Sequence, residues 1–233
     1  MKTGEWIKGI RDGLPICLGY FAVSFAFGIL AVESGCTTFE AVLISLTNLT
    51  SAGQFAGLTV MAGAGTLLEM AATQFVINSR YMLMSISLSQ KVEEKFQGIW
   101  RWILSYGITD EIFAAAIQKE GPIKRSYFAG LLCLPVLGWT AGTWLGAFLG
   151  NILPQILTNA LGVALYGMFI AVFVPKSRED QRVLTVVILA ILLRILLYYV
   201  PAFAQISSGF AIIICAAAAS AAGAALFPVK EED

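Results

Sequence analysis

The sequence predicts an all-α polytopic membrane protein, with about seven or eight transmembrane helices in a single membrane domain over residues 1–233. The chain is 58% hydrophobic and only 13% charged, and its mean hydropathy is +0.79. Soluble domains are about a quarter charged. In addition, charged or proline-marked gaps separate apolar runs of about the 20 residues that a helix needs to cross a bilayer.

These gaps define eight apolar segments, near 13–32, 39–63, 66–89, 100–118, 127–150, 160–174, 183–200 and 207–227. The segment at 160–174 is short for a full span, and the one at 100–118 carries two acids. Either is therefore a candidate for a broken or re-entrant helix, and seven spans is the alternative count.

The first segment follows a basic N-terminus and resembles the start of a signal peptide. Its apolar run continues from Leu14 to Val32 without a clear cleavage point, so we expect it to remain as the first span. LGYFAVSFAFG in this segment resembles LGWTAGTWLGAFLG in the fifth, which suggests a possible internal repeat of the kind found in transporters.

Orientation follows from the lysines and arginines of the short loops, which concentrate on the cytoplasmic side. With the N-terminus inside and eight crossings, the cytoplasmic side receives Lys2, Lys8, Arg11, Lys119, Lys124, Arg125, Lys176, Arg178, Arg182 and Lys230. The outside receives Lys91, Lys95 and Arg101. The sequence therefore predicts a multi-pass protein of the cytoplasmic (inner) membrane with both termini in the cytoplasm.

The second segment carries an unusual group of polar residues and glycine in its middle. They are Asn48, Thr50, Ser51, Gly53 and Gln54, followed by the apolar Phe55. Discontinuous helices in transporters expose backbone groups in this way to hold a carboxylate or an ion. The alternative is a kinked helix whose serine and threonine side chains bond to its own carbonyls.

The third segment contains Arg80, with Asn78 beside it and Glu69 eleven residues earlier. An uncompensated arginine in a bilayer costs about 2.5–3.5 kcal/mol, so it should face protein or water. Eleven residues at 100° each return to nearly the same side of a helix, so Glu69 and Arg80 should both point inward. Arg80 then either lines a substrate path, snorkels to an interface, or ties two helices together.

The fourth segment contains Asp110 and Glu111 at the start of an apolar helix. As a purely structural feature, Thr109 caps this helix and the two acids complement its dipole. Adjacent helical residues diverge by 100°, so at most one of the two acids can face a given site, and we expect that one to be Asp110.

The fifth segment has glycines at positions 138, 142, 146 and 150. Glycines spaced by four make a flat helix face that lets another helix approach closely. Gly138, Gly142, Gly146 and Gly150 therefore indicate a helix-packing interface, either within the chain or with a partner. The alanine-rich last segment, CAAAASAAGAAL, suggests similar packing.

Composition also excludes several classes of function. The chain has no histidine, and its four cysteines form no CxxC pair, so no metal site and no disulfide framework is expected. Equal numbers of basic and acidic residues, 15 each, argue against nucleic-acid binding. No phosphate-cradling GxxxxGK[ST] motif and no nucleophile motif is present, so we expect no cofactor and no enzymatic activity.

INSRY followed by MLMSISLS, and then TDEIF, resembles the AzlC family of branched-chain amino acid permeases. The opening GLPICLGYFAVSFAFG is similar to the family's N-terminal segment, with Pro15, Gly19 and Gly28 in place, but Ala22 and Val23 stand where the family has a second proline. The resemblance covers essentially the whole chain. It implies the larger subunit of a secondary exporter of branched-chain and similar apolar amino acids, which works with a small AzlD-type membrane subunit.

The residues themselves are compatible with an amino acid as substrate. Arg80, Asn78 and the groups around Ser51 and Gln54 suit a carboxylate, and Phe55 suits an apolar side chain. The acids suit the ammonium group or a coupled proton; they are Asp110, Glu111 and Glu69. A channel and a non-transporting scaffold subunit for a small membrane partner remain the alternatives, and an intramembrane enzyme is the weakest one.

The predicted topology can be tested with cysteines placed in the two basic loops. In a background without the native cysteines, Lys124→Cys and Arg178→Cys should not react with an impermeant thiol reagent added to intact cells, and both should react after permeabilisation. Efficient labelling of both positions from outside would overturn the orientation.

Overall fold

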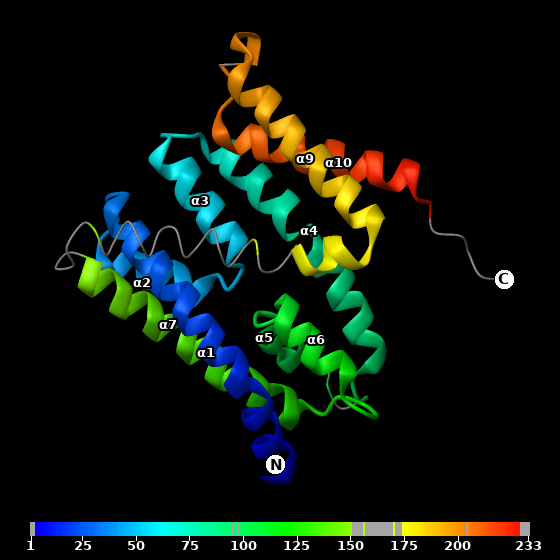
Figure 1. Ribbon diagram of the computed structural model, residues 1–233. Coiled ribbons are helices and arrows are strands. Elements are labelled where there is room, and N and C mark those ends of the chain that lie inside the picture. Colours follow the sequence, from blue (N-terminus) through cyan, green and yellow to red (C-terminus); the bar gives the residue numbers. More distant parts are fainter. Residues whose placement is uncertain are drawn as a thin grey trace. The chain divides into compact units, whose positions relative to one another are not determined.

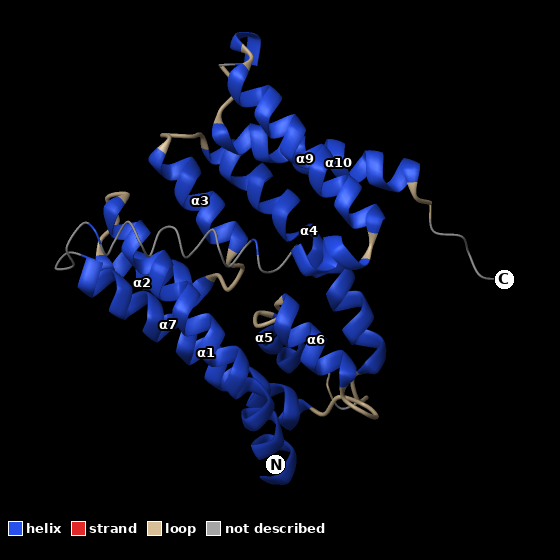
Figure 2. Cartoon of the chain, viewed as in Figure 1, coloured by secondary structure: helices blue, strands red, loops and turns tan. Residues whose placement is uncertain are grey.

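The structure is a computed structural model that describes residues 3–94, 96, 98–150, 156, 170, 174–203 and 205–228 (Figure 1). Within these ranges the chain forms helices and loops, and no strand is drawn (Figure 2). The predicted segment at 160–174 lies outside the described residues, apart from Ile170 and Val174. The predicted all-α class is confirmed for the described part of the chain.

Most of the helices follow the predicted segments, but the first begins at Thr3, ten residues before the predicted start at 13. The helices are α1 (Thr3–Glu33), α2 (Thr38–Thr47), α3 (Ala52–Ala62), α4 (Leu67–Lys91), α5 (Ile99–Ser105), α6 (Asp110–Gln118), α7 (Arg125–Gly150), α9 (Gln181–Tyr199), the 3₁₀ turn η1 (Pro201–Phe203) and α10 (Ser208–Leu226). Among the described residues, four helices are long and apolar enough to cross a membrane, namely α1, α7, α9 and α10. The exact number of spans, predicted as seven or eight, is not established by this count.

Two of the predicted segments are each divided into two short helices. α2 ends at Asn48, whose backbone is extended, and Ser51 has a φ of 49° before α3 begins. α5 ends near Gly107, and Thr109 then caps α6 by accepting a hydrogen bond from the N–H of Ile112. The four pieces contain 10, 11, 7 and 9 residues. At 1.5 Å per residue, each piece alone is much shorter than a bilayer core of about 30 Å.

The chain divides into two compact units, which are described separately below. Unit 1 comprises Met1–Gln54 and Asn78–Gly162, and unit 2 comprises Phe55–Ile77 and Val163–Asp233.

The centre of unit 1 is the pair α1 and α7, which lie side by side (Figure 1). A Cβ built on Gly138, Gly142 or Gly146 would lie closer than 3.0 Å to Cys17, Phe21 or Phe25 respectively, in each case against backbone. The residue numbers of each pair differ by 121, and Ile29 meets Gly150 with the same offset. The two helices therefore run parallel in one register, and the predicted glycine face packs against α1.

α1 contributes small residues to the same contact. A Cβ on Gly9 or Gly28 would also lie closer than 3.0 Å to the backbone of α7. At the start of both helices, Lys124 donates to a carboxylate oxygen of Glu5 at 2.8 Å. The N-terminus and the loop before α7 thus lie at the same end of this pair, as the predicted topology requires.

The parallel arrangement limits how the intervening chain crosses the membrane. If α1 and α7 both span, the segments between them must cross an odd number of times. The predicted segments at 39–63, 66–89 and 100–118 meet this condition if all three cross or if only one does. Two crossings with one re-entrant loop would make α1 and α7 antiparallel.

The other helices of unit 1 attach to this pair through buried contacts. Ser45 of α2 hydrogen bonds to Thr143 of α7 at 2.7 Å, and both residues are fully buried. Tyr20 of α1 packs edge-on against Trp139 of α7, with ring centroids 5.2 Å apart. Buried Ile112 on α6 belongs to the same hydrophobic core.

Unit 2 contains the antiparallel hairpin of α9 and α10, joined through η1. Leu197 of α9 packs against Ala211 and Cys215 of α10, and at the other end Gly223 allows the close approach of Val186. The unit also contains most of α3 and the first part of α4, which pack where Gly57 faces Met70 and Gln74.

The packing of α1 on α7 predicts a position-specific intolerance of large side chains on α7. Gly142→Leu and Gly146→Leu should destabilise the protein by more than the 1–3 kcal/mol typical of overpacking, because the new side chain would meet backbone. Ala141→Leu is the matched control, since Ala141 is exposed on the same helix. The measurement is the yield and thermal stability of detergent-purified protein, and equal values for all three variants would contradict this packing.

Candidate functional site

The candidate site of unit 1 lies where the two helix breaks meet a polar stretch of α4. The hydroxyl of Tyr106, at the end of α5, donates to the carbonyl of Leu46 in the last turn of α2. The hydroxyl of Tyr81 on α4 donates to the carbonyl of Thr50, in the α2–α3 break, at 3.4 Å. Broken helices expose carbonyls that lack helical partners, and here tyrosine hydroxyls satisfy two of the backbone carbonyls around the first break.

Arg80 is the charged group at the centre of this region. Its Nη1 forms an ion pair with Oδ2 of Asp110, and its Nη2 donates to the hydroxyl of Tyr81 at 3.3 Å. Its Nε is buried and has no hydrogen-bond partner within the described part of the chain. Arg80 and Asp110 each keep 41% of their side-chain surface exposed. The guanidinium is therefore held in place by protein but retains a free donor.

The two acids of α6 point to different partners. Asp110 meets Arg80, whereas Glu111 accepts a hydrogen bond from the hydroxyl of Tyr20 at 2.6 Å. The same hydroxyl also hydrogen bonds to Thr109, the cap of α6. Both acids lie in the first turn of α6, where negative charge is favoured by the helix dipole. Asp110 and Glu111 thus face different partners, as expected for adjacent residues of a helix.

The polar residues of the first break fall into two groups. Thr50 hydrogen bonds to the side-chain oxygen of Asn78, next to Arg80. Gln54, in the first turn of α3, donates to Ser45 at 3.0 Å, and its Oε1 is buried without a hydrogen-bond partner in the described chain. Ser51 supplies the left-handed backbone position between the two helices.

Phe55 and Glu69 belong to unit 2. Phe55 is buried on α3, and Glu69 is buried near the start of α4 with 4% of its surface exposed. In unit 1 the structure pairs Arg80 with Asp110 and joins Asn78 to Thr50, whereas Glu69 lies in unit 2 with other partners.

Three tyrosines took part in this site without being predicted from the sequence: Tyr20, Tyr81 and Tyr106. A tyrosine in an apolar helix needs a partner for its hydroxyl, which is the signal that could have drawn attention to them. The partner lies on a different segment of the chain in each of these cases, so the sequence alone does not say where that hydroxyl points.

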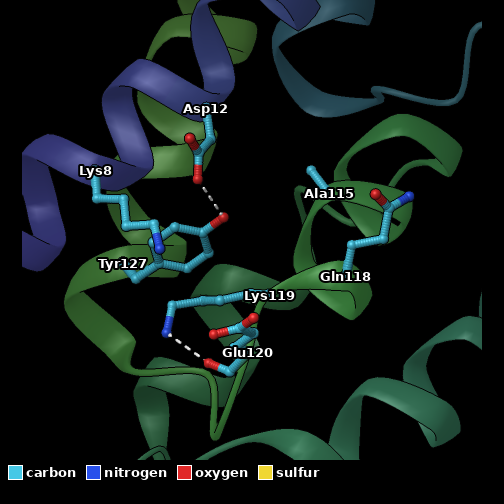
Figure 3. Close-up of a pocket in the computed structure, with 7 residues that line it drawn as sticks. All are labelled: Lys8, Asp12, Ala115, Gln118, Lys119, Glu120 and Tyr127. Atoms are coloured by element: carbon cyan, nitrogen blue, oxygen red, sulfur yellow. Dashed lines mark hydrogen bonds between the residues drawn. The ribbon is translucent and has the colours of Figure 1, made fainter.

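A second polar region, also not predicted, is a charged pocket at the N-terminal end of the α1–α7 pair (Figure 3). Its volume is about 370 Å³, and it is lined by Lys8, Asp12, Ala115, Gln118, Lys119, Glu120 and Tyr127. Tyr127 donates to Asp12 at 2.8 Å (Figure 3). Beside the pocket, Lys119 lies 3.6 Å from Glu5. The hydrogen bond to Glu5 raises the pKa of Lys124, so Lys124 stays charged at neutral pH.

The Arg80–Asp110 contact predicts energetic coupling between the two residues. Removing one partner strands the other charge in a largely apolar protein, whereas removing both does not. Arg80→Gln and Asp110→Asn should therefore each lower the stability by more than half of the loss seen in the double variant. The sum of the two single losses should exceed the double loss by a coupling energy of about 0.5–3 kcal/mol. Additive losses in detergent-purified protein would show that the pair is not formed.

Comparisons with known proteins bear on this site as a whole. The sequence pattern of the family described as AzlC protein matches residues 15–153, which include both helix breaks, Arg80 and Asp110. The inner membrane protein YgaZ of Escherichia coli K12 is 30% identical over 85% of this chain and 84% of its own.

Two other relatives are known as uncharacterised membrane proteins. One, from Archaeoglobus fulgidus, is 28% identical over 76% of this chain and 78% of its own. The other, from Helicobacter pylori strain 26695, is 26% identical over 61% of this chain and 65% of its own. No solved structure matches the chain. The family pattern, the relation to YgaZ and the apolar helices together show that the chain belongs to the AzlC family of membrane proteins.

Proposed function

We propose that this protein is the large subunit of a secondary transporter that exports branched-chain or similar apolar amino acids across the cytoplasmic membrane. In this proposal export is coupled to the proton gradient, both termini are cytoplasmic, and a small AzlD-type membrane subunit is the partner. Membership of the AzlC family supports a role connected with membrane transport. The arrangement around Arg80 supports an amino acid as the substrate.

The observation that carries the proposal is the state of the Arg80 side chain. One of its terminal nitrogens binds Asp110, while its Nε is buried without a partner in the described chain and much of its side chain is exposed. Arginine binds carboxylates through parallel hydrogen bonds from two nitrogens. The Nε is one such unused donor once the site opens to reach it, and the second becomes available if Asp110 releases its nitrogen.

An arginine–aspartate pair has the same two charges as an amino acid backbone. A zwitterion can insert into it with its carboxylate on Arg80 and its ammonium group on Asp110. Before the substrate binds, the two protein charges neutralise each other, so that neither is left uncompensated in an apolar environment. The empty and the loaded site are both electrically balanced, which suits a site that must empty and refill in each cycle.

The residues around the pair have supporting roles in this proposal. Asn78, Ser51 and Gln54 supply neutral polar groups in unit 1, and a contact of Phe55, in unit 2, with the apolar side chain stays a prediction from the sequence. Asp110, Glu111 and Glu69 are the candidates for proton coupling. The glycine face that would favour a scaffold role packs against α1 within this chain, so it does not require a partner. We propose no enzymatic activity and no cofactor.

The proposal predicts that Arg80 is needed for transport in a way that lysine cannot replace. Arg80→Lys keeps the charge but loses the planar fork, and Arg80→Gln loses both. A lost charge-assisted hydrogen bond costs about 1.5–3 kcal/mol, which is roughly a 10- to 100-fold reduction. The measurement is efflux of labelled leucine or valine from vesicles that contain both subunits, normalised to inserted protein.

Arg178→Gln is the matched control, because Arg178 is exposed. Wild-type and control vesicles should export equally, Arg80→Lys should export at least tenfold less, and Arg80→Gln less still. Near-normal efflux from Arg80→Gln would refute a carboxylate-binding role. Wild-type vesicles that move no amino acid would refute the proposed function itself.

A further inference from the structure

The three carboxylates that are candidates for proton coupling differ in their surroundings. Asp110 is paired with the guanidinium of Arg80, and Glu111 accepts a hydrogen bond from Tyr20. Glu69, in unit 2, takes part in none of the three ion pairs of the described chain. It is nevertheless the most buried of the three, with 4% of its surface exposed. A buried carboxylate without a cationic partner needs another source of compensation.

That compensation comes from the first turn of α10. Oε1 of Glu69 accepts a hydrogen bond from the hydroxyl of Ser207, which is the N-cap of this helix. It also accepts one from the backbone N–H of Gly209, at 2.9 Å. The start of a 19-residue helix carries partial positive charge. The ionised form of Glu69 therefore binds α4 to the N-terminus of α10.

A second buried polar group lies near this carboxyl and is not hydrogen bonded to it. Thr73, one turn further along α4, is fully buried, and its Oγ1 has no hydrogen-bond partner in the described chain. A Cβ on Gly209 would lie 2.5 Å from Oε1 of Glu69 and 2.9 Å from Oγ1 of Thr73, so both oxygens face the same point. A buried hydroxyl oxygen without a partner is costly, and here it is free to accept a hydrogen bond from a nearby acid.

The space around the carboxyl decides which ligand fits. A Cβ on Gly65 would lie 2.8 Å from Oε2, while the one on Gly209 would lie 2.5 Å from Oε1, so backbone encloses Glu69 closely on two sides. A sodium ion needs several oxygen ligands around it, whereas a proton needs only one oxygen and one acceptor. Thr73 offers that acceptor.

We propose that Glu69 is the binding site of the coupling proton, and that Thr73 accepts the hydrogen bond of the protonated acid. This inference rests on the proposed transport function and assigns its proton to a site in unit 2. In the step itself, one proton from water on one side adds to a carboxylate oxygen of Glu69, and the same proton later leaves to water on the other side. No other bond forms or breaks.

Protonation of Glu69 weakens the interaction between α4 and the start of α10. Hydrogen bonds from Ser207 and Gly209 to a neutral acid are weaker than those to a carboxylate, and the favourable interaction with the helix dipole is lost. The start of α10 is thus held firmly when Glu69 is charged and loosely when it is protonated. Binding of the proton therefore loosens the contact between α4 and the α9–α10 hairpin, so that the hairpin can move relative to α4.

Few other charges bear on Glu69 within unit 2. The groups that pack against it from α10 and from the α3–α4 turn are uncharged, namely Ser207, Gly209 and Gly65. On α9, Arg194 lies over the ring of Tyr198, with its Cζ 5.8 Å from the ring centroid. The other described charges of this unit are at the far end of α9 and before it: Lys176, Arg178, Glu179, Asp180 and Arg182.

Transport assays test this proposal through the difference between two modes. Glu69→Gln keeps an oxygen for Ser207 and Gly209 but cannot carry a proton. In this variant, the fold-reduction of efflux driven by a pH gradient should be at least ten times the fold-reduction of amino acid counterflow measured without a gradient. Thr73→Val removes the acceptor of the protonated acid, so the pH dependence of gradient-driven efflux should shift by about half to one unit toward acid. Thr185→Val, an exposed position on α9, should shift nothing.

A chemical assay tests the site without any transport. Hydrophobic carbodiimides modify buried carboxyl groups in their protonated form, and mass spectrometry locates the modified residue in the purified wild-type protein. Glu69 should be labelled at acid pH and progressively less as the pH rises, with no effect of Na⁺ compared with K⁺. Thr73→Val should lower the pH at which labelling is half complete.

These assays separate the possible failures. Absence of wild-type counterflow would refute the proposed function, while the labelling experiment would still test the site. Equal losses of both transport modes in Glu69→Gln, or labelling of Asp110 or Glu111 without Glu69, would overturn the assignment. Protection of Glu69 by Na⁺ at constant pH would also overturn it and would indicate a sodium site instead. If Glu69→Gln does not fold, Thr73→Val and the labelling of wild-type protein decide.

Discussion

Close backbone contact between α1 and α7 is the constraint on which unit 1 depends. Glycines on both helices remove the side chains that would separate them, so the pair stays in contact over most of its length. Tyr20 then reaches the start of α6 because Trp139 supports its ring, and α2 attaches through Ser45 and Thr143. In a bilayer, where apolar side chains gain little by leaving lipid, such small-residue contacts are a main source of helix association.

Much of the fold follows from the sequence, because apolar runs and the charges between them are local properties. The long helices α7, α9 and α10 begin and end within a few residues of the predicted segments, whereas α1 begins ten residues before the predicted start at 13. The two breaks fall in the segments that carry polar groups at their centres. The positions of the breaks were less predictable. Ser51 adopts a left-handed backbone, and neither this nor the extended Asn48 is apparent from residue types alone.

The charged residues of the candidate site could be selected from the sequence, whereas its tyrosine and threonine hydroxyls could not. An uncompensated arginine in an apolar chain is expected to face protein or water, and Asp110 was one of the few acids available to pair with Arg80. Tyr81 and Thr73 are different, because a hydroxyl can also be satisfied by its own helix. Whether Tyr81 donates to another segment, or Thr73 remains unpaired, depends on long-range packing that residue spacing does not encode.

The constant offset of 121 residues between α1 and α7 has a mechanical consequence. Sliding either helix along the other by one residue would bring side chains into positions that now admit only a hydrogen atom. The two helices must consequently translate and tilt as one rigid body. Any motion that opens unit 1 alternately to either side of a membrane has to take place at its other joints, and the two helix breaks beside Arg80 are the joints where backbone hydrogen bonding is already interrupted.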